Sequence, residues 1–247
     1  MKNINLLFYF FIFLLSCDKT GQTVNNHPKD SSKEIIPNTT KQLLHKENPS
    51  YENYSKTLGI GLIIVPEEFE LFNDSLLTYR YMKWNMYSSE NSPKPIFPKY
   101  YKPDYGILHF ICLESTSKYH KILINESKIK YSPTTNLYQF ITWDKYILQS
   151  FGIRRNNQGN HEKEPLRNSS YAKSEIVLIP EGYEMFCPIE VKGDWVKVKY
   201  DCFYNEESNL HEGEPCSSFI EKCKNPVTGW LKWRENNMVL IDIFLMP

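Results

Sequence analysis

The chain has 247 residues, and its 29 Lys and Arg residues balance 29 Asp and Glu residues, so the formal net charge is zero. Proteins that are drawn to nucleic acid by charge are usually basic, which argues against a nucleic-acid partner. Aromatic residues are abundant, glycine is scarce, and many aromatics fall in short alternating runs typical of half-buried strands. These features predict an all-β protein.

The first residues predict a secretory signal. Lys2 precedes an apolar run at residues 6–15, which is about half the roughly 20 residues that a membrane-spanning helix needs. The run ends in Leu-Leu-Ser-Cys at residues 14–17, which resembles the lipobox of bacterial lipoproteins. The resemblance implies a signal peptide at residues 1–16 and a diacylglycerol on the thiol of Cys17. The alternatives are an ordinary signal peptide with a chance cysteine and an uncleaved anchor.

A lipid on Cys17 would place the protein in the cell envelope, anchored to a bacterial membrane and facing the periplasm or the outside. Each buried CH₂ group of an acyl chain contributes about 0.8 kcal/mol to such an attachment. Asp18 resembles the inner-membrane retention signal of enteric lipoproteins, but sorting rules differ between lineages, so the choice of membrane stays open. Residues 17–56 are rich in Asn, Thr, Ser, Lys and Pro and poor in aromatics, which predicts a flexible, disordered tether.

Two short stretches, VPEEFELF at residues 65–72 and IPEGYEMF at residues 179–186, are similar and stand 114 residues apart. Residues 119–124 then match residues 195–200, and residues 140–143 match residues 230–233, in the same order. This repetition predicts two related β-domains at residues 57–153 and 173–247. The polar residues 154–172 between them are expected to form a linker.

In the second copy, the stretches Gly-Asp-Trp-Val-Lys-Val (193–198) and Gly-Trp-Leu-Lys-Trp (229–233) resemble bacterial SH3 domains, which are small β-barrels. The resemblance implies two SH3-like domains in tandem. The first copy departs from the pattern, because Tyr138-Gln139 stands where the Gly-Trp pair would be, so a binding role for both copies is in doubt. It also carries an insertion with Pro93, Pro95, Pro98 and Pro103, interpreted as a surface loop ordered by its aromatics in preference to a polyproline II ligand.

Three tryptophans of the second copy, Trp195, Trp230 and Trp233, are the candidate ligand-binding residues, since aromatics at strand ends form platforms for peptides or sugars. Strand alternation puts Trp230 and Lys232 on one face and Leu231 and Trp233 on the other. At most one of Trp230 and Trp233 is therefore expected at the surface. The alternative is that Trp195 or Trp230 fills the core.

The cysteines Cys187, Cys202, Cys216 and Cys223 are candidates for disulfides, which export would permit. We expect one or two bridges that pin the polar loop at residues 203–226, for example from Cys202 to Cys216 or Cys223, with three pairings open. Cys112 is expected to be free and buried. A metal site using His211 and three cysteines is disfavoured because no C-x-x-C pair is present.

The sequence shows no catalytic signature. Cys112 and His120 lie in strand-like runs, unlike the helix-borne thiolate of a cysteine peptidase, and no G-x-S-x-G, H-E-x-x-H or glycine-rich phosphate loop occurs. The sequence therefore favours a non-catalytic, membrane-anchored binding module for wall peptides (peptidoglycan) or an envelope protein, with no cofactor or metal. The alternatives are an immunity or inhibitor lipoprotein that neutralises a toxin or hydrolase, and an enzyme of unfamiliar type.

Overall fold

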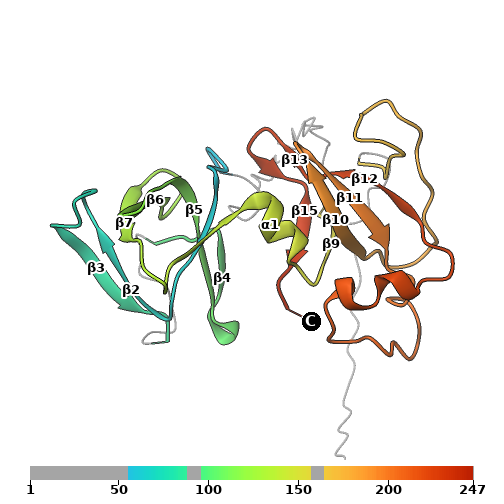
Figure 1. The fold of residues 1–247 in the computed structure, drawn as a ribbon, viewed down its shortest axis with the longest axis horizontal. Helices are drawn as coiled ribbons and strands as arrows, with labels where there is room; N and C mark the ends of the chain where they lie inside the picture. Colours follow the sequence, from blue (N-terminus) through green and yellow to red (C-terminus); the bar gives the residue numbers. More distant parts are fainter. Residues whose placement is uncertain (1–54, 88–95, 157–163, 247) are drawn as a thin grey trace, which may run out of the picture. The chain divides into compact units, whose positions relative to one another are not determined.

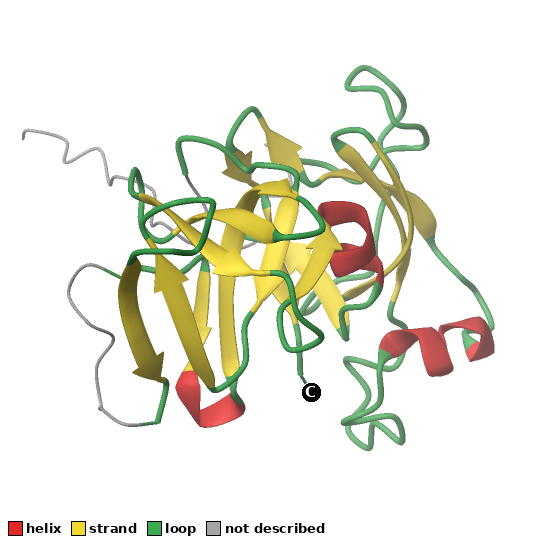
Figure 2. Cartoon of the chain, turned by 60° about the vertical axis from the view of Figure 1, so that its left-hand side comes forward, coloured by secondary structure: helices red, strands yellow, loops and turns green. Residues whose placement is uncertain are grey.

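The computed structural model describes residues 55–87, 96–156 and 164–246. In these residues the chain forms two large antiparallel β-sheets, a two-stranded ribbon and a single short α-helix (Figures 1 and 2). The predominantly β, antiparallel architecture confirms the fold class at this level. No helix in the described ranges is long and apolar enough to cross a bilayer. The signal peptide, Cys17 and almost all of the tether lie outside the described residues.

The first sheet has eight strands. Hydrogen bonding follows the order β3-β2-β7-β6-β5-β1-β8, and β4 pairs with β5 beside this path. The elements of this half are β1 (Gly61–Ile64), β2 (Glu68–Phe72), β3 (Arg80–Asn85), β4 (Tyr100–Lys102), the 3-10 helix η1 (Pro103–Tyr105), β5 (Ile107–Ser115), β6 (Tyr119–Leu123), β7 (Ile129–Pro133) and β8 (Gln139–Thr142).

The second sheet has five strands in the order β12-β11-β10-β9-β15. It follows helix α1 (Trp143–Leu148), which packs against β10. The remaining elements are β9 (Gly152–Arg155), β10 (Phe186–Lys192), β11 (Trp195–Tyr200), the 3-10 helices η2 (Cys216–Ser218) and η3 (Ile220–Lys222), β12 (Thr228–Lys232), the ribbon β13 (Arg234–Glu235) with β14 (Met238–Val239), and β15 (Ile241–Phe244).

The two sheets share a connectivity. In the second, β9 to β12 are neighbours in chain order, and β15 returns to pair with β9. In the first, β1, β5, β6 and β7 are neighbours in the same way, and β8 returns to pair with β1. The hairpin of β2 and β3 is an addition beyond β7. A returning last strand is what a small meander needs before it can curl into a barrel.

The second sheet begins earlier than the sequence predicted. Strand β9 is the first strand of this sheet in chain order, and it crosses the expected domain boundary between residues 153 and 154. Arg167, in the expected linker, exchanges backbone hydrogen bonds with Trp230 at 2.7 and 2.9 Å, and Leu166 is buried in the core. The described part of the linker thus extends the sheet beside β12.

The repeated motif occupies two different environments. Phe69 of the first copy lies on β2 and is 1% exposed, whereas its counterpart Tyr183 lies outside any named strand and is 79% exposed. The match of residues 140–143 with 230–233 also pairs β8 with β12, which hold different places in their sheets. Only residues 119–124 and 195–200 correspond, since they form β6 and β11, each the third strand of its meander. The two halves therefore share the connectivity of their strands, whereas the repeated motif that suggested a duplication has a different structure in each half.

One hydrophobic cluster joins the two halves. It contains Leu62 and Ile111 of the first sheet, Trp143 of α1, and Val196 and Trp233 of the second half. A second cluster fills the other face of the first sheet, where Ile63 and Phe110 are fully buried. The described residues from 55 to 246 accordingly belong to one compact unit.

The described part of the proline-containing insertion is packed. Ile96 and Lys99 are buried, Tyr100–Lys102 form β4 against β5, and Pro103 opens η1. This agrees with the interpretation of an ordered loop. Pro93 and Pro95 lie outside the described residues.

Candidate functional site

The candidate tryptophans lie on the hairpin of β11 and β12. Trp195 stands opposite Lys232 across the strand pair, and Trp230 stands opposite Lys197. Side chains directly opposite each other share a face and lie about 5 Å apart at Cβ. The two tryptophans and the two lysines therefore form one mixed surface, which we call the Trp-Lys face.

The opposite face of the same hairpin is core. Val196, Val198 and Leu231 are buried there, whereas Trp195 and Trp230 on the Trp-Lys face are only half-buried. This is the alternation that the sequence predicted, with Trp230 and Trp233 on opposite sides. The Trp-Lys face leaves two indole rings partly open to solvent.

Trp233 is not at the surface. It is 2% exposed, its Nε1 donates a hydrogen bond of 2.8 Å to the Gly193 carbonyl oxygen, and its ring centroid lies 5.8 Å from that of Trp143. A ring with both its hydrogen bond and its apolar contacts satisfied inside the core cannot meet a ligand. The candidate platform is therefore reduced to Trp195 and Trp230.

The charged residues of the Trp-Lys face are mainly lysines with acidic neighbours. Lys192 pairs in register with Trp195 and Glu190 with Lys197, so both belong to this face. Lys232 forms an ion pair with Glu235. Lys199, the next lysine of β11 on this face, forms an ion pair with Glu221. Lysine side chains lay their apolar stems along neighbouring surface and keep the ammonium in water. The indole rings thus sit among lysine stems, a surface suited to an apolar group next to a carboxylate.

The lysines were not recognised as site residues from the sequence. The signal for them was present, because Trp-Val-Lys-Val-Lys at residues 195–199 and Trp-Leu-Lys at residues 230–232 place lysines two positions after each tryptophan. Residues two apart on a strand share a face. The same reasoning that separated Trp230 from Trp233 therefore identifies the lysines as neighbours.

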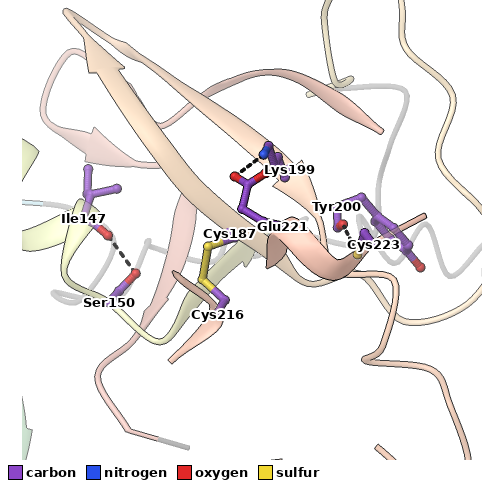
Figure 3. The surroundings of a disulfide bond; sticks show 8 residues. All are labelled: Ile147, Ser150, Cys187, Lys199, Tyr200, Cys216, Glu221 and Cys223. Carbon is purple, nitrogen blue, oxygen red and sulfur yellow. Dashed lines mark hydrogen bonds and ion pairs between the residues drawn. A yellow bond between two sulfur atoms is a disulfide. The ribbon is translucent and has the colours of Figure 1, made fainter. Parts of the chain in front are cut away.

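Two disulfides stabilise the loop beyond β11. Cys187 bonds to Cys216, and Cys202 bonds to Cys223, with Cα–Cα distances of 5.5 and 5.9 Å. Figure 3 shows the first bridge joining β10 to η2, close to the Lys199–Glu221 ion pair. The prediction of one or two bridges in this half is confirmed, and the pairing that the sequence left open is resolved.

The bridges reinforce a small apolar core in this loop. The four cysteines, Phe203, Phe219 and Ile220 form a small cluster of their own. The bridges close segments of 29 and 21 residues. Closing a loop of this length stabilises the folded state by roughly 3 kcal/mol for each bridge. The loop is therefore held in place although most of its residues are polar.

Cys112 is buried in β5, and it is the single free cysteine among the described residues. Burial raises the pKa of its thiol to about 12. The pKa of His120 is lowered by burial, and its Nδ1 lies 3.0 Å from the Ser115 hydroxyl. A thiol with such a pKa is protonated at neutral pH and is a poor nucleophile. Among the described residues no cluster of three or more His, Cys, Asp or Glu side chains is arranged to hold a metal ion.

Comparison with known proteins found no matching family model, no matching curated protein and no matching solved structure.

Proposed function

We propose that this protein is a cell-envelope lipoprotein, anchored through Cys17, that acts as a non-catalytic binding module for wall peptides or an envelope partner. Two SH3-like domains in one compact unit would provide the scaffold. The shared connectivity of the two sheets supports this proposal, because in each meander the last strand returns to the first.

The Trp-Lys face is the observation on which the binding role rests. Trp195 and Trp230 are large aromatics that are not needed in the core, and they stand directly across from Lys232 and Lys197. Partly exposed aromatics flanked by polar groups are a common basis of recognition, because the ring supplies contact area at low entropic cost. Peptides that carry a free carboxylate are complementary to this surface.

The lipid anchor predicts a specific count of thiols. In the denatured, unreduced full-length protein we expect a single thiol that reacts with iodoacetamide, that of Cys112, because the disulfides occupy four cysteines and a lipid occupies Cys17. In the native protein even Cys112 should stay unmodified, since it is fully buried and its pKa is raised to about 12. Mass spectrometry of the alkylated protein, purified from bacterial membranes, measures both states.

The control for this count is Cys112→Ala, which should leave no reactive thiol in the denatured protein. A second alkylated site at Cys17 would show that the cysteine carries no lipid. That result would remove the anchor from the proposal and leave the binding role to be tested separately.

Binding to the wall is tested by sedimentation with purified peptidoglycan. The full-length protein in detergent is expected to sediment with the wall material, and the double variant Trp195→Ala/Trp230→Ala is expected to lose about tenfold or more in affinity, as removal of paired aromatic contacts commonly does. The matched control is Tyr171→Ala/Tyr183→Ala, which removes two exposed aromatics from outside this face. Equal loss in both variants, or no enrichment of the unaltered protein, would contradict the proposal.

A second candidate function is an immunity or inhibitor lipoprotein. It is favoured by an exposed apolar segment, in which Ile176 and Leu178 point away from the core while Val177 and Ile179 pack against it. Leu178 is 84% exposed and Ile176 is 58% exposed, so two apolar side chains of one short segment are open to solvent. Absence of wall binding combined with a discrete protein adduct from a photo-crosslinker at Leu178 would favour this function over the first.

A further inference from the structure

A cavity of about 350 Å³ lies at one end of the second sheet, away from the residues of the Trp-Lys face. It is bounded by the disulfide-bonded loop and by the C-terminal end of β15. Its volume is at the lower end of the range of about 300–1,000 Å³ that is typical of ligand sites. It therefore suits a small molecule or a single side chain.

Part of the cavity wall is apolar. Phe151, Phe219 and Phe244 contribute rings, and Met185 and Met246 contribute thioethers. Phe219 is held by a parallel stack with His211, whose ring centroid is 4.6 Å away at an interplanar angle of 7°. Phe219 directly follows η2, which the Cys187–Cys216 bridge joins to β10, and it belongs to the same apolar cluster as these cysteines. A wall that is already ordered loses little entropy when a ligand binds.

The polar groups of the cavity are predominantly acidic. Asp201, Glu212 and Glu214 line it, His211 is also present, and none of the described lining residues is Lys or Arg. The Ser218 hydroxyl donates a hydrogen bond of 2.9 Å to Glu214 and lowers the pKa of that carboxyl, with smaller contributions from His211 at 3.3 Å and from Lys222 outside the lining. Glu214 is therefore ionised at neutral pH.

Asp201 is the buried acidic residue of the cavity lining. It is 3% exposed, and its Oδ1 accepts a hydrogen bond of 2.9 Å from the Phe203 amide. Burial raises the pKa of its carboxyl, against the opposing effect of the backbone amides of Phe203 and Tyr204 and of His211. No described Lys or Arg forms an ion pair with it. Buried carboxylates are normally compensated by a cation, and for Asp201, which lines the cavity, the only such group nearby among the described residues is His211.

We propose that this cavity binds an organic cation, an ammonium or guanidinium group on an apolar stem no larger than a basic amino-acid side chain. The stem would lie against the phenylalanine and methionine walls, and the cationic group would approach Asp201 with Glu214 at the rim. Cations also bind favourably over aromatic faces when water is excluded. The inference is independent of the wall-binding proposal, because none of the residues of the Trp-Lys face lines the cavity.

The experiment uses full-length protein labelled with ¹³C-methyl methionine in detergent. Met185 and Met246 line the cavity, and Met82, Met86 and Met238 do not, so the protein carries its own controls. Benzylammonium is expected to shift the Met185 and Met246 signals in a saturable way and to bind roughly tenfold more tightly than neutral benzyl alcohol. Raising the salt concentration from about 0.02 to about 0.2 M should weaken the binding of benzylammonium but not that of benzyl alcohol, because salt screens the charge.

Variants test the role of the carboxylates. Asp201→Asn keeps the Oδ1 acceptor for the Phe203 amide and removes the charge, and it should weaken benzylammonium about fivefold or more. Glu207→Gln, an exposed change of equal charge in the same loop but outside the lining, should leave the affinity unchanged. If Asp201→Asn loses the native methionine spectrum, Glu214→Gln at the exposed rim provides the same test, with a weaker loss.

Two peptides distinguish the source of the cation. Acetyl-Gly-Lys-Gly-amide is compared with its norleucine analogue, which lacks the ammonium but keeps the stem. Binding of the lysine peptide identifies a polypeptide side chain, and binding of benzylammonium alone identifies a free amine. Equal binding of amine and alcohol, or shifts that do not depend on Asp201 or Glu214, would overturn the proposal.

Discussion

Replacing Glu184 with glutamine is expected to lower the free energy of unfolding by roughly 3–5 kcal/mol, because it leaves the charge of Arg155 buried without its partner. The side chains of Arg155 and Glu184 are only 3% and 7% exposed. Both carboxylate oxygens of Glu184 accept hydrogen bonds from the Arg155 guanidinium, and Oε1 also accepts one from the Arg155 amide at 3.0 Å.

The adjacent residue provides a matched control. Arg154 forms an ion pair with Asp242 at 2.9 Å, but these side chains are 45% and 37% exposed. Exposed ion pairs contribute about 0–1 kcal/mol, so Asp242→Asn should change stability little. The two variants make the same kind of change on partners of neighbouring residues of β9, and burial is the main difference between them.

Guanidinium denaturation of the full-length protein, followed by circular dichroism with the disulfides intact, measures both effects. The double variant Arg155→Met/Glu184→Met should recover much of the loss, since an apolar pair leaves no unpaired buried charge. If Glu184→Gln is no more destabilising than Asp242→Asn, the ion pair does not hold the segment before β10 against β9, and other contacts must keep that segment in place.

This ion pair shows where the sequence-based interpretation of the repeat stops. Glu184 and Glu70 align in the repeated motif, but Glu70 lies on β2 and forms a partly exposed ion pair with Arg80 at 3.4 Å. A strand and an irregular segment can share Pro, Glu and aromatic residues in the same order, because these residues specify local turns and not partners far along the chain. The partner of Glu184 is 29 residues away, so no local pattern indicates it.

The predictions that held are those that depend on strand alternation and cysteine chemistry. The half-buried strands β11 and β12 were recognisable because their apolar residues alternate with lysines. Strand β9 was missed because its sequence Gly-Ile-Arg-Arg contains a single apolar side chain between Gly152 and two arginines. Its membership of the second sheet is set by pairing with β10 and β15, which are distant in sequence. Long-range pairing is also why the disulfide connectivity stayed open.

Near the end of β12, Trp233 is buried in the core and Trp230 is half-exposed. Replacing each by alanine should therefore change the free energy of unfolding by very different amounts. Trp233→Ala is expected to cost roughly 3–5 kcal/mol of unfolding free energy, the usual range for a buried tryptophan. The change removes a ring that packs on Trp143, and it also leaves the Gly193 carbonyl without its 2.8 Å hydrogen bond. Trp230→Ala, on the half-exposed face, should cost about 1 kcal/mol.

The intermediate variant Trp233→Phe divides the first effect into its parts. It keeps most of the apolar contact and removes the indole donor, so it should lose about 1–3 kcal/mol, the cost of the lost hydrogen bond to the Gly193 carbonyl oxygen together with a small cavity. Because Trp233 belongs to the cluster that includes Leu62 and Ile111, its loss should lower the stability of both halves in one transition. Two separate unfolding transitions, with the first half unaffected by Trp233→Ala, would show instead that the halves fold as independent domains and that the shared core contributes little to their cohesion.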